Sequence, residues 1–188
     1  AYTITTTMPA QTRPIFAKWD LITYQITYDL QDSTVTNPTS YTVESDDIIL
    51  QAPSKAGYQF AGWLMEGSSE PQLVISIPSG STGDRHYEAI FTPITYTITY
   101  QLNGGSASNP TSYTIETDTI TLLAPQRDGY VFLGWTFSGQ GTPLLDVVIT
   151  KGSTGNRHFV AVYELESYDI TYVLDGGDNH LTNPATYT

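Results

Sequence analysis

The sequence contains no cysteine, so disulfide bonds, cysteine-based zinc sites and thiol chemistry are excluded. It is also poor in positive charge, because 7 of its 188 residues are Lys or Arg against 19 Asp or Glu, a formal net charge of −12. Such a chain repels nucleic-acid phosphates and anionic lipid headgroups. No apolar run approaches the ~18 residues that a membrane-spanning helix needs. We therefore expect no nucleic-acid partner and no direct membrane insertion.

Helical patterns are scarce as well. No apolar period of 3.6 residues is sustained, whereas 14 Tyr and many Thr supply the aromatic and β-branched side chains that favour strands. The sequence therefore predicts a mainly β fold, α+β at most.

The chain repeats itself with a period of 72 residues. Residues 22–28 (ITYQITY) recur as 94–100 (ITYTITY), and the same offset relates 62–63 (GW) to 134–135 (GW). A long fixed period is typical of a tandem array of small domains. We predict the end of a preceding repeat at 1–20, repeat 1 at 21–92, repeat 2 at 93–164 and the start of a following repeat at 165–188. The chain is thus expected to be a fragment of a longer protein.

Each repeat is expected to consist of strands. Apolar and polar residues alternate through 22–30, which predicts a half-buried strand, and the Asn-Gly-Gly at 103–105 supplies the following turn. Repeat 1 has Gln-Asp-Ser at 31–33 instead, so we expect a different turn there. Further strands are expected around 40–44, 46–50, 57–63 (a central strand) and 85–91, the last with Tyr87, Ala89 and Phe91 pointing inward.

These patterns resemble the Listeria–Bacteroides repeat, also known as the B-repeat of internalin-type surface proteins. The matching segments are 98–105 (ITYQLNGG), 129–135 (GYVFLGW), and the closing 17–19 (AKW) and 161–163 (AVY). Repeat 1 departs from the pattern by lacking Gly-Gly after its first strand. The resemblance implies a β-grasp-like domain in a secreted, wall-attached bacterial protein, used as a spacer or a protein-interaction module. It implies no catalysis.

Residues that could carry catalysis are few. His86 beside Asp84, with Ser81 nearby, could be read as a base and a nucleophile. The alternative is that 80–83 is a turn and His86 an outward residue of the last strand, and a repeated turn explains the recurrence at His158 equally well. We predict no catalytic residue and no enzyme activity.

Metal and crosslink chemistry is also weakly indicated. The Asp-Gly-Gly-Asp at 175–178 or the pair Asp46-Asp47 could hold calcium, but an EF-hand needs a longer series of ligands. A Lys–Asn crosslink is conceivable, yet the three lysines (Lys18, Lys55 and Lys151) share no repeat position. The sequence favours no metal and no other cofactor.

The leading hypothesis is a non-catalytic stalk or spacer, extracellular on a bacterial cell surface or wall, with a possible role in adhesion and virulence. The alternative is a module that binds a glycan or host protein weakly at each repeat and gains from avidity. Its surface would lie at Arg85, His86, Arg157 and His158. The aromatic stripes could line a sugar platform, but their alternation favours a core.

The expected partners are host proteins or neighbouring surface proteins. We also expect the partial units at the two ends of the chain to complement each other between molecules, because an exposed half-sheet presents unpaired strand edges. The alternative is that the physical domain boundary is shifted relative to this repeat frame.

Overall fold

The computed structural model describes residues 17–137 and 140–188. These residues form strands and no helix, which confirms the mainly β expectation. Each repeat has a four-stranded sheet and a separate two-stranded ladder. The strands of repeat 1 are β1 (Tyr24–Asp29), β2 (Ser40–Tyr41), β3 (Ile48–Ile49), β4 (Tyr58–Met65), β5 (Ser76–Ile77) and β6 (Arg85–Pro93). Those of repeat 2 are β7 (Tyr96–Gln101), β8 (Ser112–Tyr113), β9 (Ile120–Thr121), β10 (Tyr130–Phe137), β11 (Val148–Ile149) and β12 (Arg157–Leu165).

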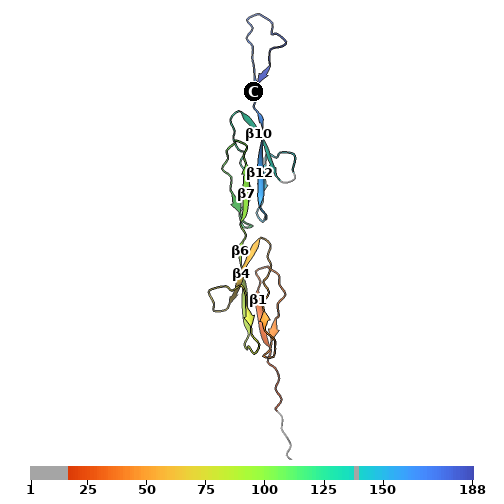
Figure 1. Cartoon of the computed structure of the whole chain (residues 1–188), viewed down its shortest axis with the longest axis vertical. Helices are drawn as coiled ribbons and strands as arrows, with labels where there is room; N and C mark the ends of the chain where they lie inside the picture. Colours follow the sequence, from red (N-terminus) through yellow and green to blue (C-terminus); the bar gives the residue numbers. More distant parts are fainter. Residues whose placement is uncertain (1–16, 138–139) are drawn as a thin grey trace, which may run out of the picture.

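The first and last strands of each repeat lie side by side and parallel. Tyr28 of β1 is opposite Tyr87 of β6, and Tyr100 of β7 is opposite Phe159 of β12. Because both strands run in the same direction, the chain enters a repeat at one end and leaves it at the other. β6 has nine residues, about 30 Å at ~3.3 Å per residue. Figure 1 shows the two repeats following each other along the long axis of the molecule.

β4 lies at the edge of its sheet. The strand order is β2-β1-β6-β4, so the expectation of a central strand at 57–63 is wrong, and β1 and β6 hold the middle positions. On its outer side β4 meets a single bridge, in which Trp63 and Gln72 exchange backbone hydrogen bonds of 2.8 and 2.9 Å. Alternation along a strand indicates which face is buried, but it does not indicate which strands are neighbours.

Gly62 makes this arrangement possible. The pairing of β4 with β6 shifts register between Phe60 and Gly62, and Gly62 has a φ of +141°. A Cβ at this position would lie 2.8 Å from the backbone nitrogen of Gln72. The Gly-Trp of the repeated motif therefore combines a bulge that only glycine fits with the side chain that fills the core.

The strands after β1 are shorter than their patterns predict. β2 ends at Tyr41 rather than residue 44, because the Oγ of Ser45 accepts a hydrogen bond of 3.0 Å from the Thr42 backbone and turns the chain. β3 covers two residues of the predicted 46–50 and pairs with β5.

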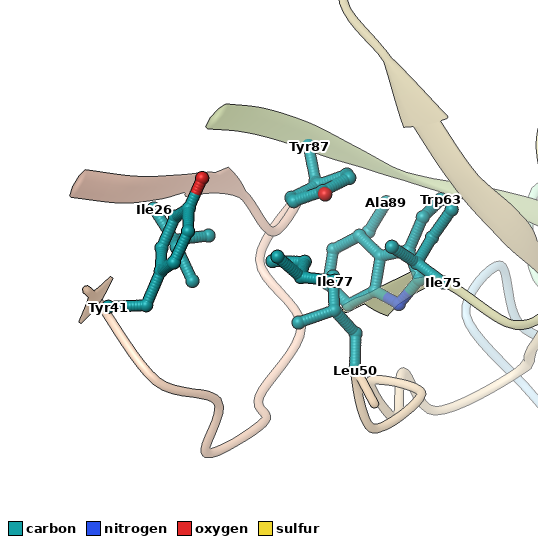
Figure 2. Packing of buried hydrophobic residues seen from close by; sticks show 8 residues of the cluster. All are labelled: Ile26, Tyr41, Leu50, Trp63, Ile75, Ile77, Tyr87 and Ala89. Atoms are coloured by element: carbon teal, nitrogen blue, oxygen red, sulfur yellow. The ribbon is translucent and has the colours of Figure 1, made fainter. Parts of the chain in front are cut away.

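The hydrophobic core of repeat 1 lies between the four-stranded sheet and the β3–β5 ladder. Figure 2 shows Tyr87 and Ala89 of β6 facing Ile77 and Leu50, with Trp63 at one side. The inward orientation predicted for Tyr87 and Ala89 is confirmed, since both are buried, and the half-buried Phe91 packs against the same core. Repeat 2 buries the equivalent set, with Phe159 in place of Tyr87 and Val147 in place of Ile75.

The turn after the first strand is the same in both repeats, so the expectation of a different turn at 31–33 is wrong. Gln31 and Asp32 have φ of 51° and 62°, and Asn103 and Gly104 have 48° and 88°. In each case the third turn residue donates its backbone N–H to the carbonyl of the leucine that directly follows the strand, at 2.9 Å. Gln31 takes a positive φ although residues other than glycine seldom do, and its side-chain amide donates a hydrogen bond of 3.1 Å to Glu88 of β6.

The ends of the chain are simpler. Residues 1–16 of the predicted preceding unit lie outside the described residues, and 17–20 form no strand. The segment predicted to start a following unit contains β13 (Tyr168–Asp169) and β14 (Thr186–Tyr187), which pair antiparallel and leave Val173 and Leu181 almost fully exposed. Within the described ranges, no helix has the length and apolar character needed to cross a membrane.

Candidate functional site

The predicted interaction surface begins at the first residue of β6 and of β12. Arg85 is half-buried, and its Nε donates a hydrogen bond of 3.2 Å to the Oη of Tyr41. That hydroxyl in turn donates to the carbonyl of Gly83 at 2.5 Å. Arg157 and Tyr113 repeat the first bond at 3.2 Å. The two arginines thus join the start of the last strand to the second strand of the same repeat.

The two histidines of the predicted surface are exposed. The Nδ1 of His86 lies 2.9 Å from the Oγ1 of Thr27, and His158 and Thr99 repeat the contact at 2.8 Å. The structure therefore places each Arg-His pair together at one end of a sheet, with the histidine as the more accessible member.

An open groove runs beside this pair in repeat 1. Its volume is about 570 Å³, and it is lined by Met65, Glu66 and Asp84 in addition to Arg85 and His86. The groove thus presents both signs of charge within a small area.

A smaller hollow of about 100 Å³ lies at the equivalent place in repeat 2. Phe137 and Asn156 stand there where repeat 1 has Met65 and Asp84. The two repeats share the position of the site but not its size or charge.

The three residues considered for catalysis are engaged with separate neighbours. Asp84 accepts a hydrogen bond of 2.7 Å from the backbone of Gln25, and His86 contacts Thr27. Ser81 closes a backbone turn with the carbonyl of Pro78 at 3.1 Å. The arrangement positions strands and a turn rather than a nucleophile beside its base.

The acidic pairs have structural contacts. Asp47 accepts a hydrogen bond of 2.7 Å from the backbone of Ser79, and at the matching site Thr119 accepts one of 3.2 Å from Lys151. The exposed turn at 175–178 is closed by a backbone bond of 2.8 Å from Gly177 to Leu174. In the part of the chain that the structure describes, no three His, Asp or Glu side chains gather as metal ligands would.

The contacts recorded for the three lysines involve aspartates or aromatic rings. Lys18 lies 4.0 Å from Asp20, and Lys151 lies 3.0 Å from Asp118, both exposed pairs. The Nζ of Lys55 stands 4.6 Å from the ring centre of Tyr58. None of these contacts brings a lysine to an asparagine.

Sequence reasoning missed a cluster at the end of repeat 1 that faces repeat 2. We call it the junction patch: Lys55, Gly57, Tyr58 and Phe91 in repeat 1, and Arg127, Gly129, Tyr130 and Tyr163 in repeat 2. The Oη of Tyr58 donates a hydrogen bond of 2.9 Å to the carboxylate of Glu116 in the next repeat, which raises the pKa of Tyr58. Cations one period apart, at 55 and 127, are the signal that could have found it.

The cation of the patch lies closer to its ring in repeat 2. The guanidinium of Arg127 stands 3.5 Å from the ring centre of Tyr130, against 4.6 Å for Lys55 and Tyr58. Both patches thus place a cation over a tyrosine ring, the geometry of a cation–π contact, and the distance is shorter in repeat 2.

Comparison with known proteins gives a family and distant relatives. The family model of the Listeria-Bacteroides repeat domain matches residues 24–84 and 96–162. Internalin H of Listeria monocytogenes is 29% identical over 120 residues, which cover 63% of this chain and 22% of that protein.

A protein of Evansella cellulosilytica named as a Gly-rich membrane protein is 24% identical over 184 residues, 90% of this chain and 20% of its own length. A second membrane protein of that organism, by its name, is 23% identical over 173 residues, covering 88% of this chain and 24% of its own length. The chain thus spans about a fifth to a quarter of these relatives. No solved structure matches it significantly.

Proposed function

The chain belongs to the Listeria–Bacteroides repeat domain family, and on that basis we propose that it is a non-catalytic stalk segment of a secreted, surface-attached bacterial protein. The repeats would hold a more specialised domain away from the cell surface or wall. The names of the relatives, an internalin and membrane proteins, support a location at the bacterial surface.

One observation carries the spacer proposal: β1 and β6 are parallel. An antiparallel pair would return the chain to the end at which it entered, and successive repeats would then fold back on each other. With the parallel pair each repeat adds its own length to the array, and residues 94–95 alone connect β6 to β7. A short connection of this kind restricts the angle between neighbouring repeats.

Small-angle scattering tests the spacer proposal on this chain and on arrays of four and eight repeats. We expect the maximum dimension to grow by roughly 25–35 Å per repeat, the size of a compact unit of this length. A maximum dimension that stays constant as repeats are added would contradict the proposal.

The β-grasp character of each repeat is likewise a proposal. It is supported by the strand order β2-β1-β6-β4, in which a parallel central pair is flanked by antiparallel neighbours. An experimental structure with another strand order would exclude it.

A second candidate function is avidity-based binding of a glycan or host protein at the groove beside Arg85 and His86. Its support is the recurrence of a hollow at the same place in both repeats. The histidines are the better test positions, because they are exposed whereas the arginines are half-buried. Replacing His86 and His158 by Ala should abolish binding to an array of host-cell glycans and surface proteins at an unchanged melting temperature. Unchanged binding would remove this candidate.

We also propose that the partial units pair between molecules. The exposed Val173 and Leu181 support this, because unpaired apolar surface of a half-sheet favours association. Light scattering coupled to size exclusion should show dimers that increase with concentration. A monomer at every concentration would contradict the pairing.

A further inference from the structure

The contact between repeats 1 and 2 joins two defined surfaces. One is the junction patch of repeat 1. The other is the tip of repeat 2, which we define as Ile115-Glu116, the residues that follow β8, and whose equivalent in repeat 1 is Val43-Glu44. The tip reaches the patch with both residues, since Ile115 meets Gly57 and Glu116 accepts a hydrogen bond from Tyr58.

The apolar half of this contact is closely fitted. A Cβ built on Gly57 would lie 2.5 Å from the Cδ1 of Ile115, so the glycine leaves the space that the isoleucine occupies. Ile115 is half-buried at this contact. Gly129 has a similar φ, +74° against +78°, and a Cβ there would have no neighbour within 4 Å.

The polar half is complementary in charge. The ammonium of Lys55 lies over the rings of Tyr58 and Phe91, at 4.6 and 5.6 Å from their centres. Lys55 and Glu116 line the same hollow of about 290 Å³ at the junction. A cation held on aromatic rings next to a tyrosine hydroxyl suits a carboxylate, which accepts the hydroxyl proton and is attracted by the cation.

The linker adds a third point of attachment. The backbone N–H of Ile94 donates a hydrogen bond of 2.9 Å to the carbonyl of Gly57, which extends the pairing of β4 and β6 into the connection. Glu166 and Gly129 form the same bond, also at 2.9 Å, after repeat 2. The backbone thus leaves repeat 1 and repeat 2 in the same way. The difference is that a tip contacts the patch of repeat 1.

We propose that the junction patch is a docking surface for a second copy of the repeat, whose Val/Ile–Glu tip is the occupant. The junction between repeats 1 and 2 is its occupied form, and the patch of Arg127, Gly129 and Tyr130 is the same surface on repeat 2. The contact is head-to-tail, since the patch and the tip lie on opposite ends of a repeat, and such contacts propagate along an array without closing. The inference rests on the spacer function and adds what sets the angle between repeats.

The angle between repeats 1 and 2 can be measured in the full chain, because the sequence has no native cysteine that would compete for a thiol-specific label. Cysteines at the exposed, equivalent positions Ile49 and Thr121 would carry spin labels, one in each repeat. Pulsed electron spin resonance then reports the distribution of distances between the labels. If the tip is docked, the chain with its native junction should give one narrow distribution of label-to-label distances. A broad distribution for that chain would overturn the proposal.

Three variants weaken the contact, and each has a matched control at the equivalent position. We expect Ile115→Asp, Tyr58→Phe and Gly57→Ala to broaden the distribution. Their controls, in the same order, are Val43→Asp, Tyr130→Phe and Gly129→Ala, and we expect these to leave it unchanged. Gly57→Ala and Gly129→Ala share the backbone strain of a positive φ, so their difference isolates the clash with Ile115.

Tyr58→Phe removes a single exposed hydroxyl and retains the fold, so it keeps the test valid if another variant unfolds. If each variant and its control gave the same distribution of label-to-label distances, the docking proposal would be overturned. That failure is separate from failure of the spacer function, because an array with free angles would still lengthen with each added repeat in the scattering experiment.

Discussion

A hydroxyl group at the turn after the first strand is supplied by different residues in the two repeats. In repeat 1 the Oγ of Ser33 donates a hydrogen bond of 2.5 Å to the carbonyl of Leu30. In repeat 2 the equivalent carbonyl, of Leu102, accepts a bond of 3.2 Å from the Oη of Tyr163. Both positions differ together between the repeats: repeat 2 has Gly105 where repeat 1 has Ser33, and repeat 1 has Phe91 where repeat 2 has Tyr163.

The structure explains why both positions must change together. A Cβ on Gly105 would overlap the hydroxyl of Tyr163, although the backbone of Gly105 does not have a positive φ. Gly105→Ser alone should therefore lower the stability of repeat 2 by about 1–3 kcal/mol, the usual effect of overpacking. Tyr163→Phe alone loses one hydrogen bond and should lower it by about 0.5–1.5 kcal/mol.

The double variant rebuilds the arrangement of repeat 1. The new serine takes the space and the bond of the removed hydroxyl, so we expect stability within ~0.5 kcal/mol of the parent and a coupling free energy of about 2 kcal/mol. Differential scanning calorimetry measures this, because ~1 kcal/mol shifts the melting temperature of a domain of this size by about 4–8 °C. The melting of repeat 1 in the same sample is the internal reference.

The reciprocal experiment lies in repeat 1. Phe91→Tyr should destabilise it, because the added hydroxyl meets Ser33, and Ser33→Gly in the same chain should restore it. Additive effects in both repeats would refute the reasoning, since they would mean that the two positions do not share one space.

The remaining predictions concern the bulge, the half-buried Tyr28 and the exposed tryptophan. Gly62→Ala should destabilise repeat 1 by about 3–5 kcal/mol, from positive-φ strain and the clash with Gln72, whereas Gly67→Ala, with strain alone, should cost about 1 kcal/mol in urea unfolding. Burial raises the pKa of Tyr28 from 10.0 to about 12, so the stability that its neutral form contributes is complete below pH 10 and is lost between pH 10 and 12. Between pH 10 and 12 the melting temperature should fall less for Tyr28→Phe than for the parent chain. An equal fall in both would contradict the raised pKa of Tyr28. Acrylamide should quench Trp19, which is 88% exposed, before the two buried tryptophans, and Trp19→Phe should abolish the quenchable fraction.

Local patterns in the sequence were sufficient for much of the fold. The 72-residue period and the alternation of apolar residues predicted the repeats, the absence of long helices and the inward side of the last strand. These features depend on interactions with near neighbours along the chain, because a strand with one buried face requires a period of two wherever it lies. The same motifs carried the resemblance to the family, and the structure shows that the Gly-Trp pair among them combines a bulge with a fully buried core side chain.

Only the tertiary structure decided how these pieces are joined. The sequence did not reveal that β4 lies at an edge, because a side-chain period indicates faces and not strand order. It did not reveal that Gln31-Asp32 adopts the turn of Asn103-Gly104, because the residue type of Gln31 does not indicate a positive φ. Nor did it show that Arg85 bonds within the fold, or that Glu116 meets Tyr58. The Arg85–Tyr41 and Glu116–Tyr58 contacts each join residues more than 40 positions apart, and the chain must close around its core before they can form.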